Sequence, residues 1–461
     1  MKQKGVSTRL IVVIACIAMI VVLGVAAVII AITSDTGDMA SREEIESGMA
    51  ELGDGDLGHR YVANHLLEYG FGGFDAGKLR NVEYYFNTNY PRELDSVPEL
   101  AYKTAELFMQ YYYDRLDMSD RDAVTTAIVH CFVEATGDRY AVYRTPEELE
   151  DFTVDMSGTF VGIGVSVMQS LDPATGKLAE VYVEDVINDS GADDAGILHG
   201  DYIIAVDGTP ITEHDRSSLV NAIRGEKGTT VSITVLRGTE EIVFVCERRQ
   251  VIDRTVTYSV EGSIGYIEIT SFKDNTPDLF REALSYVYSM NVDGIIFDLR
   301  NNPGGYLGAV IDVIDMLVPA DKRIVSYVDK NGAETAYSST GNGKALPVPA
   351  VVICNENTAS AGELFTAALR DYNDMGILKA TIVGKTTYGK GVMQSTFPFL
   401  DGSSITLTVA HYNPPSGENY EGVGIVPDVA VDDLEGDADE QLLRALEILT
   451  TPTGGGSNSQ M

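Results

Sequence analysis

The chain has 461 residues and a formal net charge of −36. Its length accommodates two or three domains, each with its own hydrophobic core. The negative charge argues against a nucleic-acid partner, because binding to a phosphate backbone depends on clustered lysine and arginine. Four cysteines, Cys16, Cys131, Cys246 and Cys354, are too widely spaced for a metal site or a disulfide framework. We therefore expect the three that follow residue 32 to be buried thiols.

Residues 10–32 form an unbroken run of apolar or small residues, preceded by Lys2, Lys4 and Arg9. About 20 such residues cross a bilayer as a helix, whereas the core of a signal peptide usually has about 7–15. The run therefore predicts an uncleaved transmembrane anchor. The basic flank predicts that residues 1–9 are cytoplasmic and that the body of the chain is extracytoplasmic at the cell membrane. A cleaved signal peptide is the alternative, and it would also export the body.

The pattern of residues then divides the body into segments. Residues 33–75 are rich in glycine and acidic residues and predict a tether, with some helix over 60–68. Residues 76–154 form a helical N-terminal region, in which apolar residues recur every three or four positions and predict two amphipathic helices between 98 and 135. The last segment, 451–461, has the composition of a disordered tail.

Residues 155–250 and 251–450 predict two further domains. In the first, apolar residues recur at every second position, as at Val181 and Val183 and at Val231 and Ile233, with polar or exposed residues between them. This alternation indicates a small β-rich domain. In the second, residues 294–299 and 349–354 are short apolar runs, each followed by a turn and a helix-like segment. Repeated strand, turn and helix predict an α/β core whose sheet is covered on both faces.

Ser360 lies between the predicted strand 351–354 and the predicted helix 364–370. A serine at a strand-to-helix turn presents its hydroxyl beside helical N–H groups, which can stabilise negative charge. Serine is also a common helix N-cap, so this segment alone leaves both interpretations open.

Two other segments favour the catalytic interpretation. Gly304 and Gly305 follow a buried strand, and paired glycines permit backbone conformations that aim N–H groups into a cavity, as an oxyanion hole requires. An ordinary Pro-Gly turn is the alternative. Lys390 lies between two glycines before an apolar run. A partly buried lysine there could act as a general base if desolvation lowers its pKa. Gln394, four residues on, could orient its amine.

Histidine and metal chemistry are less well supported by the sequence. His411 is the only histidine in the catalytic region, and it is kept as an alternative base. No His-Glu-x-x-His helix and no Cys/His cluster occurs. We therefore expect neither a metal nor another cofactor.

Three stretches, 298–305, 355–363 and 388–394, resemble the signature segments of the C-terminal processing peptidases, or tail-specific proteases, in the same order. The resemblance extends over about residues 78–431. It implies a crotonase- or Clp-protease-like α/β peptidase core, with Ser360 as nucleophile, Lys390 as base and Gln394 orienting the lysine. It also implies an oxyanion hole formed by the N–H of Ala361 with that of Gly304 or Gly305. Asp371 would take a supporting or structural role behind the site.

One departure from the family pattern affects the base. The loop over 373–380 is several residues longer than is usual, so that 30 positions separate Ser360 from Lys390. Spacing alone would select Lys385 instead. The flanking glycines and Gln394 favour Lys390, and Lys385 is its main competitor.

The β-rich segment resembles a PDZ domain. Gly162, Ile163 and Gly164 match the loop whose N–H groups bind a peptide's C-terminal carboxylate, and a helix over 219–223 would form the opposite wall. A bulged strand is the alternative for these three residues alone.

The whole sequence thus predicts a multidomain α+β and α/β protein behind one N-terminal transmembrane helix. The expected function is that of a membrane-anchored serine endopeptidase which cleaves extracytoplasmic polypeptides near their C-termini, with a homodimer possible through the helical region. The alternatives are a membrane-tethered PDZ scaffold with an inactive core and a crotonase-like acyl enzyme.

Overall fold

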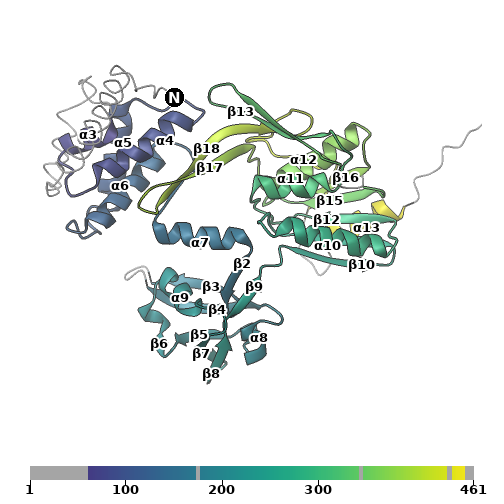
Figure 1. The fold of residues 1–461 in the computed structure, drawn as a ribbon, viewed down its shortest axis with the longest axis horizontal. Helices are drawn as coiled ribbons and strands as arrows, with labels where there is room; N and C mark the ends of the chain where they lie inside the picture. The colour runs from purple at the N-terminus through teal and green to yellow at the C-terminus, as the bar shows by residue number, and fades with distance from the viewer. Residues whose placement is uncertain (1–60, 173–176, 342–345, 433–438, 452–461) are drawn as a thin grey trace, which may run out of the picture. The chain divides into compact units, whose positions relative to one another are not determined.

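The computed structural model describes residues 61–172, 177–341, 346–432 and 439–451 (Figure 1). The predicted anchor at 10–32, the cytoplasmic segment 1–9, the tether up to residue 60 and the tail from residue 452 lie outside these residues. Among the described helices, none has the length and apolar character needed to cross a bilayer.

The chain forms two compact units. The first contains the described residues up to Leu149, together with Val328–Ala333 and Met393–Ala410. The second contains Glu150–Tyr327, Glu334–Val392 and the described residues from His411 onward. Each unit is considered separately below.

The described part of the first unit is built on the helices α3 (Val62–Glu68), α4 (Ala76–Asn89), α5 (Val97–Tyr111) and α6 (Arg121–Ala135). The helix expected near 60–68 and the two amphipathic helices are therefore confirmed. Strand β1 (Val142–Arg144) pairs antiparallel with the first part of β18 (Ser404–Asn413), which also pairs with β17 (Val392–Pro398). Asp138 fixes this pairing, because its carboxylate accepts hydrogen bonds from the N–H and the hydroxyl of Thr408.

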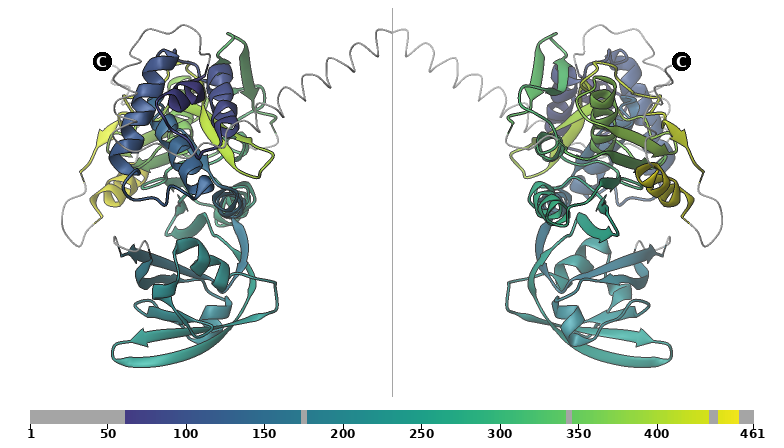
Figure 2. Two further views of the ribbon diagram at one scale, coloured as in Figure 1. Left: turned by 90° about the vertical axis from the view of Figure 1, so that its left-hand side faces the viewer. Right: turned by 90° about the vertical axis from the view of Figure 1, so that its right-hand side faces the viewer.

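The β-rich domain, coloured blue to teal in Figures 1 and 2, has the strand order β3-β4-β5-β7-β8, with β6 beside β5. Its inward-facing residues include Val181, Val183, Val231 and Ile233, all buried as the alternation predicted. Its elements are β2 (Thr159–Gly162), β3 (Val165–Leu171), β4 (Leu178–Val186), α8 (Gly191–Ala195), β5 (Tyr202–Val206), β6 (Thr209–Pro210), η2 (Ile211–Glu213), α9 (Arg216–Ile223), β7 (Thr230–Arg237), β8 (Glu240–Glu247) and β9 (Arg249–Ile252). Strands β2 and β9 pair with each other where the chain enters and leaves the domain.

The α/β core contains a six-stranded sheet of order β10-β11-β12-β15-β16-β19, in which only the β10–β11 pair is antiparallel. Its elements, with α7 leading into the β-rich domain, are α7 (Pro146–Ser157), β10 (Val256–Glu261), β11 (Ile264–Ile269), α10 (Thr276–Ser289), β12 (Gly294–Asp298), α11 (Leu307–Asp315), β13 (Arg323–Asp329), β14 (Glu334–Ser338), β15 (Ala350–Cys354), α12 (Ala361–Asp374), β16 (Ala380–Gly384), β19 (Val429–Ala430) and α13 (Glu440–Thr450). The predicted strands at 294–299 and 349–354 are β12 and β15.

Helices cover both faces of this sheet, as the sequence predicted. On one face, the ring of Phe297 in β12 contacts Phe280 of α10 and Phe365 of α12, with centroids 5.9 and 5.4 Å away. On the other face, Ile296 and Val351 pack with residues of α13. Adjacent residues of one strand thus face opposite layers, and continuous apolar runs are the expected result.

The three cysteines of the body are buried thiols, as expected. Burial raises the pKa of Cys131 and of Cys354 to about 12 and that of Cys246 to about 11. None of the three therefore has the thiolate character of a reactive cysteine.

In the first compact unit, the helical unit, one buried carboxylate has no cation nearby that fully offsets the free-energy cost of its desolvation. Glu83 of α4 is 1% exposed and accepts hydrogen bonds from the N–H of Val62. Burial raises the pKa of Glu83 to about 7, although this hydrogen bond and the charge of Arg80 oppose the shift. The folded unit therefore binds this proton more tightly than the unfolded chain does.

We expect the stability of the helical unit to fall by up to about 3 kcal/mol as the pH rises from 4.5 to 7, because the unfolded chain loses the Glu83 proton first. Glu83→Gln keeps an oxygen for the Val62 N–H but does not ionise, so it should remove this loss and stabilise the unit at pH 8. Thermal unfolding followed by circular dichroism at pH 5 and pH 8 measures the effect. The exposed Glu93→Gln is the control, and equal pH dependence in wild type and Glu83→Gln would contradict the prediction.

Candidate active site

Ser360 lies at the N-terminus of α12, after a short turn that follows β15. Its φ of 53° and ψ of −115° are unusual for a residue other than glycine. Such a conformation costs on the order of 1–3 kcal/mol and persists only where its surroundings enforce it. The predicted strand-to-helix turn at Ser360 is therefore present, and its backbone is held in one strained conformation.

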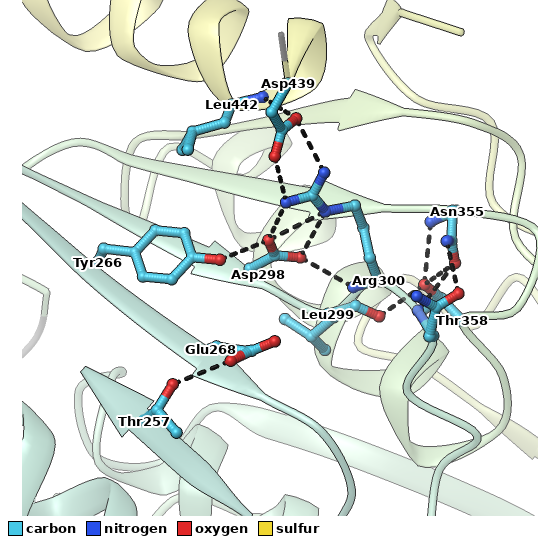
Figure 3. Close-up of polar contacts among 11 residues, drawn as sticks. Thr257, Tyr266, Glu268, Asp298, Leu299, Arg300, Asn355, Thr358, Asp439 and Leu442 are labelled. Carbon is cyan, nitrogen blue, oxygen red and sulfur yellow. Dashed lines mark hydrogen bonds and ion pairs between the residues drawn. The ribbon is translucent and has the colours of Figure 1, made fainter. Parts of the chain in front are cut away.

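The turn before Ser360 is bonded to the loop that follows the neighbouring strand β12. The Thr358 hydroxyl donates to the carbonyl of Leu299, and the Asn355 side chain accepts from the N–H of Asn301. The N–H of Ala359 donates to the carbonyl of Asn302. Figure 3 shows Asn355 and Thr358 beside the loop that begins at Leu299. Hydrogen bonds therefore join the turn before Ser360 to the glycine loop that follows β12.

Gly304 packs against the turn that carries Ser360, and Gly305 packs against Phe272, which follows β11. A Cβ on Gly304 would lie 2.7 Å from the Ser360 Cβ, and one on Gly305 would lie 2.0 Å from the carbonyl oxygen of Phe272. Both residues also have positive φ, 104° and 142°. Any side chain at either position would displace the loop, so the structure requires glycine at both.

The N–H groups of the predicted oxyanion hole differ in their hydrogen bonding. The Gly304 N–H donates to the side-chain oxygen of Asn302 at 2.8 Å. For the N–H groups of Gly305 and Ala361, no acceptor is found within the described part of the chain. Of the three, Gly305 and Ala361 therefore fit the predicted role best.

Glu363 is the residue that connects Ser360 to Lys390. One oxygen of its fully buried carboxylate accepts from the N–H of Ser360 at 2.9 Å and from the N–H of Lys390 at 2.8 Å. Its other oxygen accepts from the Thr387 hydroxyl at 2.6 Å and from the Gly389 N–H at 2.7 Å. The main chains of Ser360 and Lys390 therefore meet at a single oxygen atom.

Burial raises the pKa of Glu363, whereas its four donors favour the charged form and oppose that shift. The sequence did not predict a role for Glu363. A signal was available, because Ser360 and Glu363 have the Ser-x-x-Glu spacing of a capping box, in which the glutamate bonds back to the first N–H.

Lys385, the competing base, has a different local environment. Its amine forms an ion pair with Glu356 at 3.5 Å, and its N–H donates to the carbonyl of Cys354 at the end of β15. Lys390 instead shares the Glu363 oxygen with Ser360. These contacts favour Lys390, as the flanking glycines did.

For three other candidates, no hydrogen bond to the Glu363 carboxylate is found among the described residues. Asp371 accepts from Arg370 and from the N–H of Ser416, which fixes the loop after β18 and fits the supporting role expected for it. Gln394 belongs to the helical unit, where its amide donates to the carbonyl of Tyr140, and its contact with Lys390 stays a prediction. His411 lies in β18 and has no shown contact with Ser360 among the described residues.

The start of the glycine loop is fixed by an ion-pair cluster that the sequence analysis did not identify (Figure 3). Arg300 bonds through its guanidinium to Asp298, at the end of β12, and to Asp439, the N-cap of α13. The Tyr266 hydroxyl donates to Asp298 at 2.7 Å. The cluster thereby ties the loop after β12 to the N-terminus of α13. Asp298 is nearly fully buried.

In the β-rich domain, Gly162, Ile163 and Gly164 line a cavity of about 120 Å³, together with Leu219 and Ile223 of the predicted opposite wall. Gly164 has a φ of 81°, and a Cβ there would lie 2.3 Å from the Ser190 Cβ. The lining is otherwise apolar except for Gln169 and Arg224.

Comparisons with known proteins agree with this arrangement. Residues 263–431 match the model of Peptidase family S41, and residues 160–244 match the model of a PDZ domain. The resemblance to the C-terminal processing peptidases is confirmed. The glycine loop, Ser360 and Lys390 all fall within the S41 match, and the predicted carboxylate loop falls within the PDZ match.

Several relatives are similar over most of this chain. A "Probable CtpA-like serine protease" of Staphylococcus haemolyticus (strain JCSC1435) is 32% identical over 334 residues, which cover 72% of this chain and 64% of the relative. One of Staphylococcus aureus (strain COL) is 33% identical over 324 residues, covering 70% and 62%. The chain thus spans less than two thirds of the length of these relatives. A solved photosystem II D1 C-terminal processing protease is 26% identical with a TM-score of 0.46, covering 79% of this chain and 95% of its own.

We expect Glu363→Gln to loosen the contact between the serine turn and the lysine segment, because the amide NH₂ cannot accept the N–H groups that one carboxylate oxygen now binds. Hydrogen exchange at the amides of Ser360, Gly389 and Lys390 should accelerate by about tenfold or more, equivalent to at least about 1.4 kcal/mol. Exchange followed by mass spectrometry measures this. Glu282→Gln, whose exposed carboxylate accepts only a tyrosine hydroxyl among the described contacts, is the control. Unchanged protection at the three amides would contradict the prediction.

Proposed function

We propose that the chain is a serine endopeptidase that cleaves polypeptides near their C-termini, with Ser360 as nucleophile and Lys390 as general base. The observation that carries the proposal is the Glu363 oxygen that accepts from the N–H groups of both residues. It fixes the two main chains side by side, although 30 positions separate them in the sequence.

The proposed reaction is acyl transfer. The neutral Lys390 amine takes the proton of the Ser360 hydroxyl, whose oxygen attacks the scissile carbonyl. The N–H groups of Gly305 and Ala361 donate to the oxyanion of the tetrahedral intermediate. The lysine then protonates the leaving amine, and a water molecule activated by the same lysine hydrolyses the acyl-enzyme. Gln394 would hold the lysine amine in line.

The PDZ domain would recognise the substrate. The carboxylate of a substrate C-terminus binds the N–H groups of the loop at Gly162, Ile163 and Gly164, and the terminal side chain enters the cavity. That cavity is small and largely apolar. It therefore fits an apolar terminal residue of modest size.

The place of this activity is inferred from the sequence alone. An anchor at residues 10–32 would hold the catalytic body at the extracytoplasmic face of the cell membrane, where its substrates would be exported or membrane proteins. A homodimer formed through the helical unit stays a prediction.

Ser360→Ala and Lys390→Ala should each abolish cleavage of an unstructured polypeptide with an apolar C-terminus, because each removes one partner of the proton transfer. Gly304→Ala should lower kcat by about 10²–10³-fold, since the added Cβ displaces the oxyanion loop. Cleavage is followed by mass spectrometry of the products. Lys385→Ala is the matched control and should retain activity.

The outcomes separate the alternatives. Activity retained in Ser360→Ala would remove the serine mechanism, and a wild-type protein that binds C-termini without cleaving them would support the scaffold. Loss of activity in Lys385→Ala with activity kept in Lys390→Ala would assign the base to Lys385.

A peptide that ends in an apolar residue with a free carboxylate should bind the full chain of the Ser360→Ala variant. The same peptide with an amidated C-terminus should bind at least about tenfold more weakly, because the loop N–H groups then lose their charged acceptor. Isothermal titration calorimetry measures both affinities. Equal affinities would contradict carboxylate recognition by the PDZ domain.

A further inference from the structure

Two buried phenols lie beside the proposed catalytic pair, and the mechanism above assigns them no role. Tyr412 is near the end of β18, and Tyr420 is in the loop that follows. Their side chains are 3% and 4% exposed. The Tyr420 hydroxyl donates to the Tyr412 hydroxyl at 2.9 Å, and the rings are edge-to-face with centroids 5.9 Å apart.

Tyr412 contacts both members of the catalytic pair. Its hydroxyl donates to the main-chain carbonyl of Lys390 at 3.0 Å. The Ser360 side chain lies close enough to this hydroxyl to influence its pKa as a hydrogen-bonding neighbour. Tyr420 is 3.4 Å from the Ser360 carbonyl oxygen, close to the limit for a hydrogen bond. The phenol pair therefore touches the reacting side chain of the nucleophile and the backbone of the base.

The hydrogen-bonding capacity of a phenol defines what Tyr412 can do. A tyrosine hydroxyl has one proton and two acceptor lone pairs. The Tyr412 proton goes to the Lys390 carbonyl, and one lone pair accepts the Tyr420 proton. The remaining lone pair is available to the Ser360 hydroxyl. The two hydrogen-bond partners, Lys390 and Tyr420, fix the direction of the Tyr412 O–H, and the free lone pair is the site that the Ser360 hydroxyl can use.

Tyr412 stays protonated over the range in which the enzyme is expected to work. Burial raises the pKa of Tyr412 and of Tyr420, and the nearby Glu363 carboxylate raises both further. A neutral phenol whose proton is already donated does not compete with Lys390 as a base. Its effect on Ser360 is therefore geometric.

The phenol pair is also fastened to the lysine segment by the backbone around it. The N–H of Tyr412 and the Asn419 side chain both donate to the carbonyl of Gly391, at 3.2 and 2.8 Å. The Gly391 N–H donates to the Glu421 carboxylate at 2.7 Å. Tyr412 and Tyr420 thus keep a fixed position relative to the residue next to Lys390.

We propose that Tyr412 is a positioning residue, whose hydroxyl holds the Ser360 oxygen in one rotamer opposite the lysine segment, and that Tyr420 orients that hydroxyl. The inference rests on the proposed roles of Ser360 and Lys390. Rotation about the Cβ–Oγ bond of Ser360 redirects its O–H from the Tyr412 oxygen toward the lysine amine without moving the serine oxygen, and the proton then passes from that oxygen to the amine. Tyr412 neither gains nor loses a proton. Without it, the side chain of Ser360 can populate other staggered rotamers, in which the oxygen is misplaced for attack.

The test compares Tyr412→Phe, Tyr420→Phe and the double variant in the full chain. We expect kcat to fall about tenfold or more in Tyr412→Phe with KM changed less than twofold, and to fall less in Tyr420→Phe. In the double variant kcat should equal that of Tyr412→Phe, because Tyr420 acts only through Tyr412. A purely structural role would instead give additive effects.

Tyr372→Phe is the matched control. Tyr372 is 1% exposed, and its hydroxyl donates to the carbonyl of Arg323 at 2.7 Å, so this variant also loses a buried phenol-to-carbonyl hydrogen bond. Its kcat should stay at the wild-type value, whereas its Tm should fall about as much as that of Tyr412→Phe.

Wild-type kcat in Tyr412→Phe would overturn the inference, and so would kcat values that fall equally in Tyr412→Phe and Tyr372→Phe. Additive losses in the double variant would overturn the assignment of Tyr420. If Ser360→Ala is inactive while Tyr412→Phe is fully active, only the inference on the phenols fails. If the wild-type protein shows no cleavage that depends on Ser360, the proposed function fails, and this inference with it.

Discussion

The arrangement of the site depends on one buried carboxylate. Glu363 accepts four hydrogen bonds, two of which come from the N–H groups of Ser360 and Lys390 at the same oxygen. Hydrogen bonds to a charged acceptor are about twice as strong as neutral ones. Leaving any of these donors without a partner inside the protein would cost about 1–3 kcal/mol. The carboxylate therefore opposes every movement that would separate the main chains of Ser360 and Lys390, and the other contacts of the site add to this constraint.

The parallel sheet explains why such distant segments meet. Strands β12, β15 and β16 are adjacent and parallel, so the loops that follow their carboxyl ends emerge at the same edge. These loops carry the paired glycines, Ser360 and Lys390. Close approach then demands the residues found there: a Cβ on Gly304 would meet the Ser360 Cβ, and one on Gly389 would lie 2.9 Å from the N of Gly424. Backbone strain at Ser360 is held in place by this packing.

The sequence predicted those elements of the fold and the site that leave a local pattern of residues in it. Hydrophobic periodicity located the helices α5 and α6 and the strands β12 and β15, and the motif order located the serine and the glycine loop. It did not reveal that residues 393–410 cluster with the helical unit, because a strand carries no mark of its partner across some 260 positions. Glu363 was missed for the opposite reason: its capping-box spacing is so common at helix starts that it indicated a helix and not a link to Lys390.

Tyr412 and Tyr420 show the same limit more sharply. Tyr412 lies near the end of a strand and Tyr420 lies eight positions later in an irregular loop. No periodic pattern connects the two residues, and only the fold brings their hydroxyls together. Their position also completes the support of Ser360. The glycine loop packs against its Cβ, Glu363 fixes its main chain, and the Tyr412 hydroxyl lies beside its side chain. In the proposed mechanism, rotation of the hydroxyl proton is then the one motion of Ser360 that proton transfer to the lysine requires. Holding a weak nucleophile such as a serine hydroxyl in the productive geometry before the reaction lowers the activation free energy, because aligning it no longer costs conformational entropy.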